Sequence, residues 1–497
     1  MANSLQMNLA GGINRKVTPL ILADEECELL INYHLDQVGA ITKRKGVTQE
    51  GDQPVANSEV RGLFYDRESN DYVMVVNESL PGSTSTIYTK SPTATSFNAE
   101  KTGDPYLTEN SDGYIDRARF VNFVGRFFRL VGGNGPMLSA PSATGTYSTS
   151  DCLTTESPQF IAVYQDRIYA ARDESTGKQN RVWYSSLPDS SFNLTWDATA
   201  DGQWFDVNPD DGDVITGIEN NGNRLLIFKH RALYRWTFGL TEPDRLIGVG
   251  AVNQEVIQTN FDVGITFFAN PYGVYAYSGN RPRLISRKIQ DIIDAVTDAG
   301  WQNACAGVDN DHYYLSVGEV EIDDRTYNNV VLVYHISLDA WSVYSMHTRP
   351  SVFANMPDNT DETAPRYLYF GGADGRVYRM NFGSTDNGAP ISAYFRSKEY
   401  MIRYPEKVSF QGVDVFSNKR GNTQLRMDVD RSDITQNLGP LTSRVTNFGV
   451  EPHRIGNSIR LYATDNSDGE SQIEGFNIQY DLAVKRDQHA QRLRRYG

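Results

Sequence analysis

The sequence predicts an all-β protein whose central part is a β-propeller of about six or seven blades. Three observations support this prediction. The 497 residues include 28 tyrosines and 22 phenylalanines, which favour strands. Apolar runs are short and end at turns that contain Gly, Pro, Asn or Asp. A hairpin also recurs whose second strand ends in an aromatic residue, as in residues 225–228 and 232–234.

The hairpin returns several times along the middle of the chain, at residues 119–128, 160–169, 265–275 and 367–378. The interval from Phe128 to Tyr169 equals the interval from Tyr234 to Tyr275. Both are about 40 residues, the length of one four-stranded propeller blade. Because each blade packs mainly on its neighbours, such a fold can exceed the usual size of one domain. We therefore expect the propeller to occupy residues 55–385.

Three other regions flank the expected propeller. Residues 1–54 are interpreted as an extended N-terminal arm, in which Asp24 caps a short helix. Residues 386–483 alternate apolar and polar positions between polar turns, which predicts a C-terminal β-sandwich. Residues 484–497 form a basic tail. Inside the propeller, one helix is predicted from the helical spacing of Ile289, Ile292, Ile293 and Val296.

Charge and composition narrow the function classes. A formal net charge of −15 argues against tight binding of nucleic acid, although nucleic acid could still slide past such a surface. No apolar run approaches the length of a membrane span, and the first residues lack the pattern of a signal peptide. We expect a protein that is made and used without secretion. Its three cysteines are expected to be buried free thiols.

The sequence shows no motif of a hydrolase, a metalloprotease or a phosphate-binding loop, so we expect neither catalysis nor a cofactor. The acidic stretch 206–213 begins like a calcium loop, with oxygen-bearing side chains at its first, third and fifth places. Its glycine comes one place late, and Gly217 stands where the bidentate acid should be. We interpret this stretch as a solvated acidic turn, with no metal site.

Several segments, in this order along the chain, resemble one known family. They are residues 11–13, 24–26 and 39–46 near the start, 215–217, 225–229, 247–251, 273–275 and 284–289 in the middle, and 493–495 at the end. Together they are similar to the tail hub, or nozzle, proteins of short-tailed bacteriophages, also known as phage stabilisation or tail tubular proteins. The likeness covers most of the chain, although each motif alone is common in β proteins.

The resemblance implies a non-enzymatic structural protein of the virion tail, assembled in the host cytoplasm. Members form a homohexameric ring that contacts a tail adaptor protein and tail fibre, spike or needle proteins, and genomic DNA passes through the ring. Candidate contacts to other subunits or to the adaptor are Lys43, Arg44, Lys45, Arg492, Arg494 and Arg495. Candidate acids that line the channel are Asp206, Asp210, Asp211 and Asp213.

Two alternatives remain open at this point. A carbohydrate-binding or carbohydrate-degrading propeller that acts on host surface polysaccharide would need acids and aromatic side chains that converge in a central pocket. A protein-interaction propeller of cellular origin is the other alternative. It is the weaker of the two, because the sequence shows no repeated Trp-Asp or kelch signature.

Overall fold

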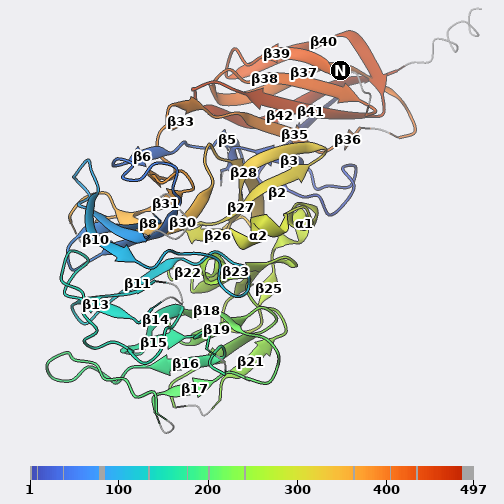
Figure 1. Cartoon of the computed structure of the whole chain (residues 1–497). Coiled ribbons are helices and arrows are strands. Elements are labelled where there is room, and N and C mark those ends of the chain that lie inside the picture. The colour runs from blue at the N-terminus through green and yellow to red at the C-terminus, as the bar shows by residue number, and fades with distance from the viewer. Residues whose placement is uncertain are drawn as a thin grey trace, which may run out of the picture. The chain divides into compact units, whose positions relative to one another are not determined.

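The structure, a computed structural model, describes residues 3–7, 9–36, 39–77, 84–131, 135–175, 177–199, 202–239, 242–361, 364–402, 404–431 and 435–483. The chain divides into two compact units, both built from strands (Figure 1). The propeller unit comprises residues 47–336 and 345–383, and the sandwich unit comprises residues 1–46, 337–344 and 384–497.

The propeller unit is a ring of small antiparallel sheets, its blades, and the described residues form seven of them. In each blade, the strands are given in chain order, and the first of them is the innermost strand. Blade 1 contains β7 (Val60–Asp66), β8 (Asp71–Asn77), β9 (Ser85–Lys90) and β10 (Asn98–Asp104). Blade 2 contains β11 (Ala118–Phe123), β12 (Arg126–Val131) and β13 (Leu138–Ala140). Blade 3 contains β14 (Phe160–Tyr164), β15 (Arg167–Ala171), β16 (Arg181–Tyr184) and β17 (Trp204–Asp206).

The remaining blades follow the same order. Blade 4 contains β18 (Ile215–Asn220), β19 (Leu225–Lys229), β20 (Leu233–Trp236) and β21 (Asp244–Ile247). Blade 5 contains β22 (Gln258–Asn260), β23 (Ile265–Asn270), β24 (Gly273–Tyr277) and β25 (Arg283–Leu284). Blade 6 contains β26 (Cys305–Val308), β27 (His312–Ile322) and β28 (Arg325–His335). Blade 7 contains β30 (Pro350–Pro357), β31 (Arg366–Gly372) and β32 (Val377–Arg379).

The ring of blades is closed. Each innermost strand contacts the innermost strand of the next blade, and β30 of blade 7 contacts β7 of blade 1. The closure also has a hydrogen-bonded component, because β6 (Thr48–Glu50) pairs with β32 and becomes the outermost strand of blade 7. A segment that precedes blade 1 in the sequence therefore completes the last blade. This confirms the predicted propeller and gives it seven blades within the described residues.

The recurrent hairpin occupies two different places in the blades. In blades 2 and 3 it is formed by the first and second strands, and in blades 4, 5 and 7 by the second and third strands. Phe128 and Tyr169 both lie in second strands, and Tyr234 and Tyr275 both lie in third strands. Each interval of about 40 residues therefore separates equivalent strands of adjacent blades, which is why it equals the length of one blade.

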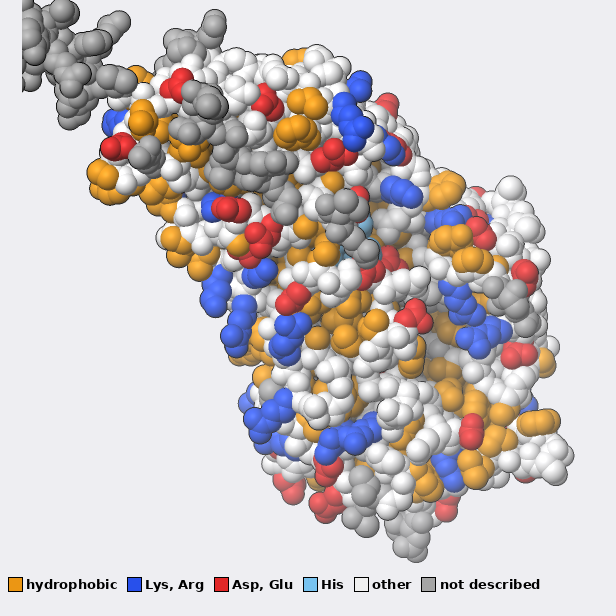
Figure 2. Space-filling model, turned by 180° about the vertical axis from the view of Figure 1, so that it is seen from behind, with side chains coloured by type: hydrophobic (Ala, Val, Ile, Leu, Met, Phe, Trp, Pro, Cys, Tyr) orange, Lys and Arg blue, Asp and Glu red, His pale blue; other side chains and the backbone are white. Residues whose placement is uncertain are grey.

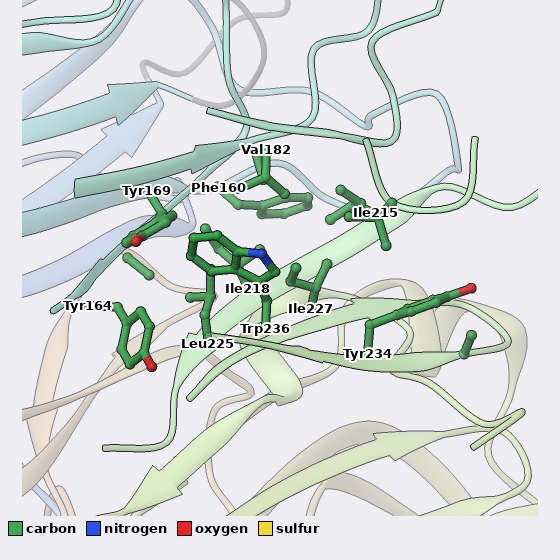
Figure 3. Close-up of a cluster of buried hydrophobic side chains, with 14 residues drawn as sticks. Phe160, Tyr164, Tyr169, Val182, Ile215, Ile218, Leu225, Ile227, Tyr234 and Trp236 are labelled. Atoms are coloured by element: carbon green, nitrogen blue, oxygen red, sulfur yellow. The ribbon is translucent and has the colours of Figure 1, made fainter. Parts of the chain in front are cut away.

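Aromatic and aliphatic side chains fill the space between neighbouring blades. Between blades 3 and 4, Tyr169 meets Trp236 edge-on with 5.5 Å between ring centroids (Figure 3). Phe205 stacks on the same Trp236 with 4.6 Å between ring centroids. Ile218 and Ile227 are fully buried in the same cluster. Burial of such side chains contributes roughly 1.5–3 kcal/mol each, so the contacts between blades are a main source of stability.

Short helices connect blades 4, 5 and 6: η1 (Gln254–Val256), η2 (Ser286–Ile289), α1 (Gln290–Asp294) and α2 (Asp298–Gln302). The helix predicted from the isoleucine spacing is present and buries Ile289, Ile292 and Ile293. It ends before Val296, which instead forms a bridge with Val320 of β27. Among the described residues, no helix combines the length and the apolar character that crossing a membrane requires.

Within the described residues, the sandwich unit contains two large sheets and one short ribbon. One consists of β4 (Tyr33–Leu35), β5 (Ile41–Lys43), β42 (Ser471–Leu482), β37 (Val408–Arg420) and β40 (Val445–Gly456), and β1 (Asn3–Met7) pairs with β42. The other includes β29 (Ala340–Ser345), β3 (Glu26–Ile31), β35 (Ala393–Ser397), β41 (Ser458–Asp465), β38 (Gln424–Val429) and β39 (Gln436–Pro440), flanked by β2 (Gly12–Ile13) and β36 (Tyr400–Met401). A two-stranded ribbon, β33 (Thr385–Asp386) with β34 (Ala389–Pro390), precedes β35. Phe395 and Phe476 stack between the two sheets.

The N-terminal segment differs from the expectation. The helix predicted after Asp24 is wrong, because residues 26–31 form β3, which is buried along its whole length and pairs with β2 and β35. The acids that suggested a helix start have other partners: Asp24 forms an ion pair with Lys398 at 2.8 Å, and Glu26 accepts a hydrogen bond from the amide of Asn14 at 2.7 Å. Long-range strand pairing therefore overrides the local capping signal. The segment expected as an arm is divided, with β1–β5 in the sandwich unit and β6 in the propeller unit.

Candidate functional site

The predicted contact residues Lys43 and Arg44 are buried inside the sandwich unit. The ammonium of Lys43 donates to Asp465 Oδ1 at 3.1 Å, and its side chain is 2% exposed. The guanidinium of Arg44 donates to both carboxylate oxygens of Asp386, at 2.8 and 2.5 Å, and to Asn32 Oδ1 at 2.8 Å. Both charges therefore have partners within their own unit. This corrects the expectation that they contact a neighbouring protein, which requires exposed side chains.

Lys45 is the exposed member of this basic cluster, and its role as a contact stays a prediction. The other three predicted contacts, Arg492, Arg494 and Arg495, lie outside the described residues. On the face shown in Figure 2, Lys and Arg side chains are interspersed with Asp and Glu side chains.

Three of the four predicted channel acids have partners close to them in the fold. Asp206, in the outermost strand of blade 3, receives two hydrogen bonds from Arg181, at 2.7 and 2.9 Å. Asp211 pairs with the buried ammonium of Lys229 at 2.9 Å. Although partial burial opposes its ionisation, this ammonium holds the pKa of Asp211 below the usual range. Asp213 is buried and accepts the backbone N–H of Arg231 at 2.8 Å.

The stretch 206–213 therefore connects blade 3 to blade 4 and holds the turn between β19 and β20. Three of its acids, Asp206, Asp211 and Asp213, bind cationic side chains or backbone N–H groups of the same chain. Asp210 differs from the other three because it is exposed.

A network of arginines and acids surrounds the starts of the innermost strands. Arg119, in β11, donates to Glu255 Oε1 at 2.7 Å and to the backbone oxygen of Gln159 at 2.8 Å. Arg117 donates to the backbone oxygens of Ser351, at 2.8 Å, and Asn303, at 3.1 Å. These two side chains thus link blade 2 to the starts of blades 3, 5, 6 and 7. We call this set, together with Glu59, Arg61, Asp112, Arg172 and Arg349, the arginine network.

The arginine network extends around the rest of the ring. Arg349 pairs with Glu59 at 3.0 Å, which joins blade 7 to blade 1, and Glu59 also pairs with Arg61 at 3.0 Å. Arg172 donates to Asp112 at 2.5 Å and to the backbone oxygen of Ile215, at the start of blade 4, at 2.9 Å. Residues from all seven blades therefore meet through charged side chains. Arg117 and Arg172 are buried, and the other charged members of the network are partly buried.

Burial affects the ionisation of groups beside this network. It raises the pKa of Asp116 to about 6, against the opposing charge of Arg119. Burial also raises the pKa of the thiols Cys27, Cys152 and Cys305, all three of which are free and buried, as expected from the sequence. Neutral, buried thiols are poor nucleophiles, so these cysteines have the properties of core residues.

The opposite ends of the same strands surround a cavity of about 370 Å³, which we call the inner-rim cavity. Four consecutive blades contribute to its lining, through β30, β7, β11 and β14. The apolar part includes Phe64, Phe120, Val163 and Phe353, and the polar part is Arg67, Asn122, Asn355 and Arg366. Among the described residues, no aspartate or glutamate lines this cavity.

Comparisons with known proteins identify no family. No family model matches the chain, and no curated protein matches it. The solved structures similar to it include the extracellular domain of the B. thetaiotaomicron protein BT4673, with 11% identity and a TM-score of 0.42 over 92% of this chain. The WD40 domain of Neurospora crassa Pan2 matches with 8% identity and a TM-score of 0.40 over 70% of this chain and 96% of its own. This chain spans 63% of the length of the BT4673 domain.

Neither the arginine network nor the inner-rim cavity was predicted from the sequence. Glu255 and Arg119 are 136 residues apart, and pairing among 62 acids cannot be deduced from sequence order. One signal was present: Arg61, Arg117, Arg119 and Arg349 each lie at the beginning of a hairpin or immediately before one. Charged residues at equivalent places in repeated units indicate a shared position, which in a propeller is one end of the innermost strands.

Proposed function

We propose that this chain is a structural virion protein that forms the ring-shaped tail hub, or nozzle, of a short-tailed bacteriophage. In this role it joins the portal-adaptor complex to distal tail parts and encloses the channel for DNA ejection. The observation that carries the proposal is the closed propeller, in which β6 completes blade 7 and the arginine network links all blades. A propeller that is closed both by strand pairing and by ion pairs between blades is suited to transmit force without deforming.

The carboxylates of the propeller support a structural role more than a hydrolytic one. Hydrolysis of a glycosidic bond commonly needs two carboxyl groups that face one substrate. Glu59, Asp112 and Glu255 instead pair with arginines, and the lining of the inner-rim cavity contains no carboxylate among the described residues. The carbohydrate-degrading alternative therefore gains no support from this cavity.

The charge of the chain suits a channel for DNA. A net charge of −15 repels a polyanion, so DNA would pass without prolonged binding. Among the four acids considered for the channel wall, we favour Asp210, because it is exposed while Asp211 and Asp206 pair with basic side chains. Lys45 is the corresponding choice for a contact with an acidic neighbour.

Sedimentation of the purified chain over a range of concentrations, alone and with its tail adaptor, tests the proposal. We expect a hexamer, seen by electron microscopy as a ring with an axial hole wide enough for duplex DNA. The substitution Lys45→Glu should weaken the assembly, whereas Lys16→Glu, a change of the same charge at another exposed position, serves as the matched control. A chain that stays monomeric under every condition would contradict the proposal.

A further inference from the structure

The inner-rim cavity combines positive charge, apolar walls and free space at the ends of the innermost strands. We propose that it is a binding site for a ring-sized organic carboxylate, whose anionic group lies between Arg67 and Arg366. This inference does not depend on the proposed function. It rests on the cavity, on the two arginines and on the chemistry of the remaining lining.

The two arginines differ from those elsewhere in the propeller because no carboxylate among the described residues pairs with either. In a chain with 62 acidic and 47 basic residues, two arginines that share a cavity without an acid are unexpected. Burial lowers the pKa of Arg366, and the neighbouring charge of Arg67 lowers it further. The two cations therefore repel one another, and an anion placed between them would relieve this repulsion.

Tyr65 helps to fix the position of Arg366. The guanidinium carbon of Arg366 lies 5.5 Å from the centroid of the Tyr65 ring, within the range of a cation–π contact. The ring itself is anchored, because the Tyr65 hydroxyl donates to Asn70 Oδ1 at 2.9 Å. Arg366 is thereby held at the cavity although its side chain reaches solvent, which reduces the entropy lost when an anion binds.

The other lining residues define the body of the ligand. Phe64, Phe120 and Phe353 supply apolar surface, and Phe64 and Phe120 are themselves in contact, with 5.8 Å between ring centroids. The amide of Asn355 donates to the backbone oxygen of Val308, which directs its Oδ1 to a role as acceptor. A volume of about 370 Å³ is at the small end of the range for ligand pockets and fits one ring with its substituents.

Two probes distinguish the two kinds of ring-sized carboxylate that could bind: D-glucuronate is an acidic sugar, and benzoate is an aromatic carboxylate. We expect titration calorimetry on the full chain to detect at least one of them, while glucose and benzyl alcohol, which lack the carboxylate, should bind at least about tenfold more weakly. Inorganic phosphate reports binding of the charge alone. Tighter binding of glucuronate would identify an acidic sugar site, and tighter binding of benzoate an aromatic acid site.

The variants Arg67→Gln and Arg366→Gln should each weaken binding by about tenfold or more, because each removes a charge-assisted hydrogen-bond donor. Arg287→Gln, at an exposed arginine in η2, is the matched control and should bind like the parent. Thermal unfolding of each variant would show that the fold is intact. Absence of binding by both carboxylates, or equal binding by Arg366→Gln and Arg287→Gln, would overturn the proposal.

Discussion

The two ends of the innermost propeller strands carry the same residue type in opposite surroundings. At the strand starts, arginines are paired with acids and with backbone oxygens of other blades, as Arg119 is with Glu255. At the strand ends, Arg67 and Arg366, which begins the adjacent strand β31, line a cavity that contains no acid among the described residues. The difference indicates two roles for arginine in this propeller. An arginine whose charge is neutralised by an acid stabilises the fold, and an arginine without such a partner is available to bind an anion.

The largest effect is expected at the paired end. Glu255 accepts a hydrogen bond from Arg119 and lies 3.7 Å from Arg117, whose side chain is 1% exposed. The substitution Glu255→Gln keeps the shape of the side chain but leaves the buried Arg117 and the partly buried Arg119 without this counterion, and should reduce the free energy of unfolding by about 3 kcal/mol. Chemical denaturation measures this change. Glu242→Gln, at an exposed glutamate, is the control, and an equal loss in both variants would contradict the structural role of the network.

A smaller loss is expected in the acidic connection between blades 3 and 4. Asp211→Asn removes the counterion of Lys229, a side chain with 0% exposure, and should cost about 2 kcal/mol, because the backbone oxygen of Asn208 still accepts from the ammonium. Asp210→Asn, one residue away and exposed, should stay within about 0.5 kcal/mol of the parent. If the two variants unfold at the same denaturant concentration, Asp211 contributes no more to stability than the exposed Asp210, which contradicts its role as the counterion of Lys229.

A third effect depends on pH and concerns Glu219, a partly buried residue of the innermost strand β18. Burial raises the pKa of Glu219 from 4.5 to about 7, opposed by a hydrogen bond to Thr259. The folded state thus holds this proton more firmly than the unfolded state, so its contribution to stability is complete below about pH 4.5 and is lost as the pH rises to about 7. Glu219→Gln should leave stability unchanged at pH 4 and raise it by about 2 kcal/mol at pH 8.

Denaturation of parent and variant across this pH range checks that expectation. Asp262→Asn, at an exposed acid in the turn after β22, is the control and should show no such dependence. A stability difference between Glu219→Gln and the parent that is the same at pH 4 and pH 8 would mean that Glu219 does not titrate in this range.

Local sequence patterns predicted the blades, whereas contacts between residues far apart in the sequence could not be predicted. The hairpin at residues 225–234 reports its own strand pairing, because both strands and the turn are adjacent in sequence. The start of the chain shows the limit: β3 was expected as a helix, since its partners β35 and β29 lie hundreds of residues away. The contacts of the arginine network could not be predicted for the same reason: Arg117 donates to the backbone oxygen of Ser351, which is 234 residues away in the sequence. Lys43 and Arg44 were mistaken for surface residues for this reason.

The most direct test of the contrast between the two ends is the free energy of unfolding of one matched pair, Arg119→Gln and Arg366→Gln. Arg119→Gln breaks the shorter of the two ion pairs of the partly buried Glu255 and leaves it only Arg117 at 3.7 Å, so it should destabilise the chain by about 3 kcal/mol. Arg366→Gln removes a repelled, solvent-accessible cation and should change stability by less than about 0.5 kcal/mol. Equal losses in the two variants would contradict the account, because both arginines would then serve only the fold.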